Sequence, residues 1–214
     1  MLRLHDYLPS QNGYKIRMLL RHLGLGWETV PVAIFRGEAR TPEFLEKNPV
    51  GAIPVLEPAP GQFIAESNAI LCYLAEGTRF LPAERLARAQ VMQWLFFEQY
   101  YVEPNLGTLR FWTLTGRLHA NAALVPGNRT GAERALQALE RHLGMRAFLA
   151  ADAYTIADIA VFAYTHLGED AGFDFAHYPA LSAWIARVKE TAGELPPVHP
   201  YSIDPDAGLR AGET

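Results

Sequence analysis

Cysteine is nearly absent from this 214-residue chain, in which Cys72 is the only one. A single cysteine cannot form an intrachain disulfide, and it supplies neither a C-x-x-C redox pair nor a cysteine-rich zinc site. The seven histidines show no ligand spacing such as H-x-x-x-H, so we expect no metal centre. Cys72 falls within an apolar helical stretch, where packing is the more frequent role of an isolated cysteine.

The chain also lacks an excess of charge of one sign. Its 19 basic and 23 acidic residues are interspersed and give a net charge of −4, which leaves no basic footprint for nucleic acid and no polybasic patch for a membrane surface. No segment approaches the roughly 20 apolar residues of a membrane span. The N-terminus Met1–Asp6 does not have the form of a signal peptide. We therefore expect a cytoplasmic protein without nucleic-acid or membrane partners.

Half of the residues are apolar, enough for a sizeable core, and their spacing in the first part of the chain alternates between strand and helix. Strand-like alternation over 2–5 is followed by helical spacing over 14–25 and by a second strand over 27–32. These segments form a β-α-β unit, whose strands should be parallel. A short helix after Thr41-Pro42, a hairpin and a final helix complete the order β-α-β-α-β-β-α, which is the thioredoxin-like layout.

Strand signals end near Gly77, and every later segment is helical or connecting. We therefore place a domain boundary there. The predicted organisation is an α/β domain over 1–77, a linker over 78–85, an all-helical domain over 86–192 and a tail over 193–214. The tail has too little periodicity for an assignment.

Capping sequences mark helix starts in the helical region. Thr155-Ile-Ala-Asp158 has the capping-box form and precedes an apolar helix. Thr130-Gly-Ala-Glu133 has the same form, so we expect a helix to start there after a loop over 125–128. Upstream, Pro104 is expected to kink or end a long, aromatic-rich helix that begins near Ala83.

The run Ile53-Pro54-Val55-Leu56 is apolar and β-branched but contains a proline. Because proline cannot donate to a ladder, it belongs at a strand start, an edge or a bulge. Two interpretations stay open. Pro54 is either an edge residue without a partner, or part of a cis peptide that turns the Ile53 backbone towards a ligand.

Glu66-Ser67 precedes an apolar helical stretch through Ala75, which places Ser67 at a helix N-terminus. The N–H groups, the positive end of the helix dipole and a hydroxyl favour a carboxylate there, while Glu66 can take an ammonium. The pair therefore suits an amino-acid zwitterion. In the structural alternative, Ser67 only caps the helix and Glu66 only complements its dipole.

A small α/β domain of this order followed by an all-helical domain resembles the cytosolic glutathione transferase family over essentially residues 1–192. Asn48-Pro-Val-Gly-Ala-Ile-Pro54 is similar to the family's loop before its cis-proline. Glu66-Ser-Asn-Ala-Ile-Leu71 is similar to the helix start that holds the γ-glutamyl group, and Ala157-Asp158 to the capping box of the helical domain. The resemblance implies a thioredoxin-like domain plus an all-α domain, a homodimer, and glutathione as co-substrate without a metal.

Glutathione attacks electrophiles as its thiolate, which is a minor form at neutral pH. Ser10 ranks first for stabilising this anion as a hydrogen-bond donor, because it lies between the first strand and the first helix. Asn12 ranks second, with a turn residue before Gly13 as its structural alternative, and the phenol of Tyr7 ranks third. The spacing resembles the serine or threonine branches and bacterial members of the family. No cysteine lies near position 10, so glutaredoxin-like use of a protein thiol is not expected.

The resemblance also implies roles for residues around the hairpin. Ile53 would pair its backbone with the cysteinyl unit of glutathione, while Val50 and Pro54 shape the turn. Arg40 and Lys47 are candidates for the glycyl carboxylate, with an ordinary solvated charge as the alternative. A pocket for a small hydrophobic electrophile is expected between the domains, although aromatic residues at helical spacing are more often core. The candidates for this pocket are Tyr100, Tyr101, Arg110, Phe111 and Trp112.

Three functions follow from this interpretation. The first is a transferase that adds glutathione thiolate to a small hydrophobic electrophile. The second uses the same site to reduce a disulfide or peroxide with glutathione. The third is a non-catalytic interaction module of the same family, against which the presence of Ser10, Pro54, Glu66 and Ser67 argues.

Overall fold

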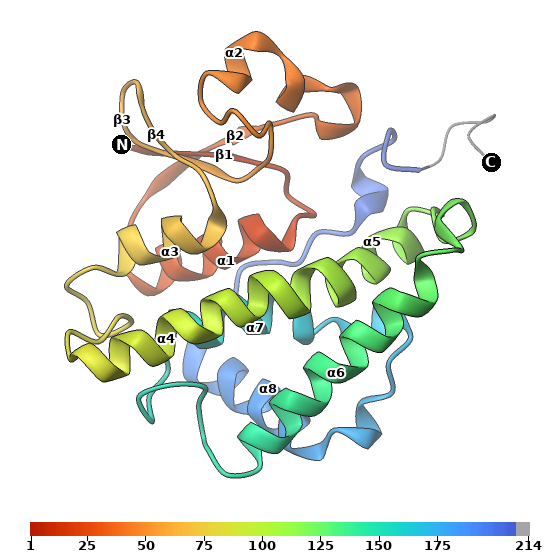
Figure 1. Cartoon of the computed structure of the whole chain (residues 1–214). Coiled ribbons are helices and arrows are strands. Elements are labelled where there is room, and N and C mark those ends of the chain that lie inside the picture. Colours follow the sequence, from red (N-terminus) through yellow and green to blue (C-terminus); the bar gives the residue numbers. More distant parts are fainter. Residues whose placement is uncertain (209–214) are drawn as a thin grey trace. The chain divides into compact units, whose positions relative to one another are not determined.

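A four-stranded mixed sheet organises the first unit of the structure, a computed structural model that describes residues 1–208 (Figure 1). β1 (Leu2–Asp6) pairs in parallel with β2 (Trp27–Pro31) and antiparallel with β3 (Val55–Ala59). β3 in turn pairs antiparallel with β4 (Gln62–Ile64), which gives the strand order β2-β1-β3-β4. The predicted thioredoxin-like layout is confirmed, including its parallel β-α-β unit.

Helices cover both faces of this sheet (Figure 1). α1 (Gln11–His22) and α3 (Ser67–Ala75) lie side by side on one face. The short α2 (Pro42–Leu45) lies over the other face, where Phe44 and Val55 belong to one buried apolar cluster. The N-termini of α1 and α3 are the parts of this unit that concern the site described below.

The last part of the chain returns to this first unit, which comprises Met1–Glu76 together with Leu195–Ala207. The Tyr201 ring lies near the Tyr7 ring, with centroids 6.2 Å apart. Nε of Arg36 pairs with the Asp206 carboxylate at 2.5 Å. The described part of the predicted 193–214 tail is therefore held beside the end of β1 and the segment after β2. Residues 209–214 lie outside the described residues.

The second unit, Gly77–Glu194, is helical. All ten residues of its α7 are buried, so this helix forms the centre of the unit's core. The last helix buries Leu181, Trp184, Ile185 and Val188. The helix bounds are α4 Arg85–Phe97, α5 Thr108–Leu114, α6 Val125–Leu143, α7 Ile156–Thr165 and α8 Pro179–Ala192.

The capping box at the start of α7 is present as predicted. The Asp158 carboxylate accepts from the Thr155 backbone N–H at 3.0 Å, and the Thr155 hydroxyl accepts from the Ala157 N–H at 3.2 Å. The same carboxylate also accepts from Leu149 N and from Trp184 Nε1. The box therefore joins α7 to the preceding loop and to α8.

One helix boundary differs from the prediction. Pro104, expected to kink or end its helix, does not end the helical path but lies inside a π-helical segment, Glu98–Gly107, that connects α4 to α5. Because a π segment already departs from the i→i−4 ladder, the missing N–H of proline costs less there. α6 begins at Val125 rather than near Thr130, because Pro126 suits a first helical turn. The Thr130 hydroxyl donates to the Pro126 carbonyl at 3.1 Å instead of capping.

No helix within residues 1–208 is both long and apolar enough to cross a membrane. Within the same residues, no three His, Cys, Asp or Glu side chains gather in a way that could hold a metal ion.

Candidate functional site

Ser10 is the N-cap residue of α1 and is partly exposed. Its Oγ accepts a long hydrogen bond of 3.5 Å from the Gly13 N–H. Because this bond uses the oxygen as acceptor, the hydroxyl proton can donate to a ligand. The hydroxyl also lies at the positive end of the α1 dipole, where an anion is favoured.

The loop that leads to Ser10 is fixed by a buried ion pair between Asp6 and Arg17. Arg17 Nη2 also donates to the Leu8 carbonyl at 2.9 Å. A Cβ atom on Gly13 would lie only 1.8 Å from Asp6 Oδ1, so a glycine is needed for α1 to approach this carboxylate. The ion pair and the close approach together hold the β1–α1 loop in one conformation.

The N-terminus of α3 has Glu66 at the N-cap and Ser67 at the first helical position, as predicted. Ser67 is buried, whereas Glu66 is exposed and makes no capping hydrogen bond through its side chain. The Glu66 backbone has a φ of 67°, a conformation that costs a non-glycine residue about 1–3 kcal/mol. The Glu66 carboxylate is therefore exposed at the helix start and does not cap the helix.

Asn12 connects the two helix N-termini. Its Oδ1 accepts from Ser67 Oγ at 3.1 Å and from Lys15 Nζ at 2.8 Å. Lys15 Nζ also donates to Ser67 Oγ at 3.2 Å, although the two residues are 52 positions apart in the sequence. The tertiary structure thus joins Asn12 to the proposed zwitterion site, a link that the sequence does not reveal.

Lys15 is a site residue that sequence reasoning missed, and its side chain is fully buried. A signal for it exists, because Lys15 precedes Leu19 by one helical turn and so shares the buried stripe of α1 with Ile16 and Leu19. A lysine in such a stripe needs polar partners, since a lysine is almost never fully buried without them.

The peptide bond between Ile53 and Pro54 is cis, the geometry that the second interpretation of this proline requires. The β1–β3 ladder ends at the His5–Val55 pair, so Ile53 lies outside it. Ile53 is partly exposed and Pro54 is buried.

The two cations expected at the glycyl carboxylate contact neighbouring backbone. Arg40 Nη1 donates to the Val50 carbonyl and so braces the loop before Pro54. Lys47 Nζ donates to the Glu43 carbonyl at 2.8 Å. Arg40 is exposed, and Lys47 is partly exposed.

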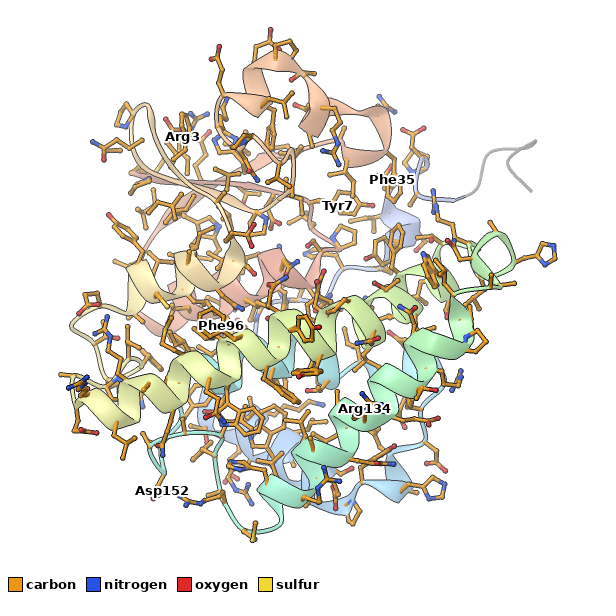
Figure 2. All side chains as sticks on the ribbon, viewed as in Figure 1. Arg3, Tyr7, Phe35, Phe96, Arg134 and Asp152 are labelled. Atoms are coloured by element: carbon orange, nitrogen blue, oxygen red, sulfur yellow. The ribbon has the colours of Figure 1, made fainter. Side chains whose placement is uncertain are left out.

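Tyr7, at the end of β1, is 7% exposed and has the Phe35 ring 5.8 Å away, with both labelled in Figure 2. Beside it lies a groove of about 360 Å³. Three segments line this groove: the loop before Ser10, the segment after β2 and the tail. Its residues are Asp6, Tyr7, Leu8, Pro9, Pro31, Val32, Ala33, Arg36, Glu38, Ile203, Asp204 and Pro205.

A second groove of about 700 Å³ runs along α4 and the π-helical segment, where Phe96 is labelled in Figure 2. It contains two of the five residues expected in the electrophile pocket, Tyr100 and Tyr101. Most of its side chains are aromatic. Its residues are Gln93, Trp94, Phe96, Phe97, Gln99, Tyr100 and Tyr101.

The other three electrophile-pocket candidates lie on α5 and do not line that groove. Arg110 is buried and its Nε donates to the Asp170 carboxylate at 2.9 Å. The guanidinium carbon of Arg117 lies 5.4 Å from the Phe111 ring centroid. Phe111 and Trp112 are partly exposed.

Both units match known protein families. Residues 1–76 match the family model described as glutathione S-transferase, N-terminal domain, and residues 94–191 match the one described as glutathione S-transferase, C-terminal domain. Among curated proteins, the chain is 31% identical over 194 residues to the disulfide-bond oxidoreductase YfcG of Escherichia coli (strain K12). That alignment covers 86% of this chain and 88% of the relative.

Solved structures from bacteria are also similar to this chain. A possible glutathione S-transferase from Rhodopseudomonas palustris is 44% identical with a TM-score of 0.86, and the match covers 89% of this chain and 94% of that one. A glutathione transferase family member from Pseudomonas fluorescens, with two glutathione bound, is 32% identical with a TM-score of 0.76. That match covers 88% of each chain.

Proposed function

Because the chain belongs to the glutathione S-transferase family, we propose that it is a glutathione transferase in which Ser10 stabilises the thiolate of glutathione for attack on a small hydrophobic electrophile. The observation that carries this proposal is the contact between Asn12 Oδ1 and Ser67 Oγ, 3.1 Å, which brings two helix N-termini together. One helix start offers partners for a zwitterion, and the other offers donors for a thiolate. One glutathione molecule can use both.

The proposed contacts follow the polarity of the ligand. The Glu66 carboxylate takes the γ-glutamyl ammonium, and the N-terminus of α3 at Ser67 takes the adjacent carboxylate. The Ile53 backbone, which lies outside the β1–β3 ladder, pairs with the cysteinyl unit, and the loop through Val50 and Pro54 holds it there. Arg40 and Lys47 take the glycyl carboxylate.

The proposed reaction needs no covalent step on the protein. The thiol loses its proton to solvent, the sulfur lone pair forms a carbon–sulfur bond, and the leaving group departs with the electron pair of the broken bond. Lowering the thiol pKa by about two units requires roughly 2.7 kcal/mol of preferential interaction with the thiolate. A hydrogen bond to a charged group contributes about 1.5–3 kcal/mol, so the Ser10 hydroxyl can supply most of it.

We place the electrophile in the groove beside Tyr7, because the Tyr7–Pro9 wall of this groove leads directly into Ser10. Its volume of about 360 Å³ lies at the small end of the range for small-molecule sites. The apolar side chains of Val32 and Ile203 suit a hydrophobic ring.

For the aromatic groove on α4 we propose a different occupant, a second copy of this chain. Phe96 and Tyr100 are 67% and 72% exposed, a large apolar surface for an isolated subunit to leave in water. This assignment agrees with the homodimer that the family resemblance implies.

Calorimetry with reduced glutathione tests the binding half of the proposal. Replacing Glu66 with alanine removes the proposed partner of the ligand ammonium and should weaken binding about tenfold or more, given roughly 1.5–3 kcal/mol for a charge-assisted hydrogen bond. A wild-type protein that does not bind glutathione would show the proposed function to be wrong.

Titration of the thiolate absorbance of bound glutathione tests the chemical half. Ser10→Ala should keep binding but raise the thiol pKa of the bound ligand by about one unit, the size of one partly compensated hydrogen bond. An unchanged thiol pKa would assign the donor role to Asn12 or Tyr7 instead.

A second candidate function, reduction of a disulfide by glutathione, is favoured by the similarity to a disulfide-bond oxidoreductase over 86% of this chain. Here the thiolate attacks a substrate sulfur and releases a thiolate. A second glutathione then resolves the mixed disulfide and yields glutathione disulfide. The same donors serve both reactions, since both begin from the thiolate. Turnover of mixed disulfides and peroxides, compared with halogenated aromatics and epoxides, separates the two candidates.

A further inference from the structure

Lys15 is a buried cation that donates hydrogen bonds to two residues of the candidate site. Its side chain is 0% exposed, and its Nζ donates to Asn12 Oδ1 at 2.8 Å and to Ser67 Oγ at 3.2 Å. Both acceptors belong to the proposed glutathione site.

The ammonium determines which way the Asn12 amide is turned. An ammonium has only donors, so the Asn12 atom that faces Lys15 must be the carbonyl oxygen and not the amide nitrogen. The Ser67 oxygen also accepts from Lys15, which directs the Ser67 hydroxyl proton to Asn12 Oδ1, 3.1 Å away. Oδ1 therefore receives two donors, and a flipped amide would place an N–H group against both of them.

With Oδ1 held towards Lys15 and Ser67, Nδ2 of Asn12 points along the opposite edge of the planar amide group. Within residues 1–208 no protein acceptor is recorded for this nitrogen, and the Asn12 side chain is partly exposed. Asn12 lies in the first turn of α1, two positions after the N-cap Ser10. The Nδ2–H group of Asn12 and the Ser10 hydroxyl can therefore donate to one anion at the N-terminus of α1.

We propose that Lys15 is a positioning residue for the thiolate site: it locks the Asn12 amide so that Nδ2–H, and not Oδ1, faces the sulfur of glutathione. This inference rests on the proposed function. Without Lys15 the amide can rotate, and a carbonyl oxygen turned towards the sulfur would repel the thiolate that the N–H stabilises. Lys15 acts through Asn12 and does not itself touch the ligand.

A double-mutant cycle on the thiol pKa of bound glutathione tests this role. Lys15→Met removes the donor at nearly constant side-chain length and should raise the thiol pKa by about one unit, a roughly tenfold lower ratio of thiolate to thiol. In an Asn12→Ala background the same replacement should change the thiol pKa little. The matched control is Lys189→Met on the exposed face of α8, which should leave the thiol pKa unchanged.

Equal increases in the Asn12 and Asn12→Ala backgrounds would overturn the proposal, because they would indicate direct action of the charge. No increase in either background would also overturn it. Lys15→Gln keeps an amide donor and serves if the methionine variant does not fold; the glutamine should then raise the thiol pKa less than Asn12→Ala does. Binding of glutathione by the wild-type protein is measured in the same titration, so a failure of the proposed function is distinguishable from a failure of this inference.

Discussion

The indole Nε1 of Trp184 donates to Oδ1 of Asp158 at 2.9 Å, so the capping residue of α7 also anchors α8. The same carboxylate also accepts hydrogen bonds from the backbone N–H groups of Leu149 and Thr155. All of these groups are buried with Asp158, which is 0% exposed.

Replacing Asp158 with alanine should therefore lower the free energy of unfolding by about 3 kcal/mol or more, because several buried donors lose their acceptor at once. Urea unfolding of the second unit's helical signal measures the change. Asp174 is a suitable control, since it caps an exposed turn by accepting from the Ala176 N–H. Asp174→Ala should cost no more than about 1 kcal/mol. Equal losses in both variants would contradict the anchoring role.

His166 should make the protein less stable in mild acid. Burial against the stacked Phe162 ring, 4.3 Å away between centroids, lowers the pKa of His166 to about 4 from its usual 6.5. The unfolded chain thus binds a proton that the folded chain refuses between these two pH values, and stability falls as the pH falls through that window. The loss should be on the order of 2–3 kcal/mol.

The His166→Phe variant lacks this titration. Urea unfolding at pH 7 and pH 4 should show a smaller acid loss for the variant than for the wild type. The effect of Asp158, whose pKa burial raises to about 6, acts in the opposite direction but cancels because both proteins contain it. Parallel pH dependences of the two proteins would show that His166 does not contribute.

Replacing Glu66 with glycine or with alanine should change the stability of the protein differently but its affinity for glutathione alike. At a φ of 67° a glycine is less strained than an alanine, because glycine has no Cβ atom. Glu66→Gly should therefore be more stable than Glu66→Ala by about 1 kcal/mol. Both variants lose the partner of the γ-glutamyl ammonium, so both should bind glutathione more weakly than the wild type and to a similar extent. Thermal unfolding and calorimetry measure the two properties, and an alanine variant as stable as the glycine variant would disprove the strain.

Filling the groove beside Tyr7 should impair the second substrate alone. Ile203 lines this groove from the tail and is 51% exposed. Ile203→Trp should raise the KM for a halogenated aromatic several-fold and leave glutathione affinity unchanged, because it occupies the space proposed for the ring. Val198→Trp, also in the tail but outside the groove lining, is the control. Equal kinetics for both variants would place the electrophile elsewhere.

The aromatic groove on α4 should determine the oligomeric state. Sedimentation equilibrium should give a dimer for the wild type and a monomer for Phe96→Glu, because a buried unpaired carboxylate opposes association. Met145, which is 80% exposed, provides the control: Met145→Glu should leave the dimer intact. A monomeric wild-type protein would contradict the proposed dimer contact but not the proposed glutathione site.

Local signals predicted much of the fold. Capping and spacing identified the start of α7 and the helix start at Ser67, since each depends on neighbours within a turn or two. Prediction was wrong at the start of α6, where Pro126 and Thr130 both resemble first-turn residues and the helix begins at Val125. The sequence predicts that Pro104 kinks or ends its helix but not that it lies in a π segment, because a π segment has no clear sequence signal.

By itself, the sequence determined the order of strands and helices, the change from an α/β region to a helical one, and the polar groups at two helix N-termini, because these depend on residues close together in the chain. The tertiary structure alone decided which of those groups meet. The contacts of Asn12 with Ser67 and of Tyr7 with Tyr201 join residues far apart in sequence, and no local periodicity encodes them. Lys15 illustrates the difference, since its place on the α1 stripe is readable from the sequence whereas its contacts with Asn12 and Ser67 are not.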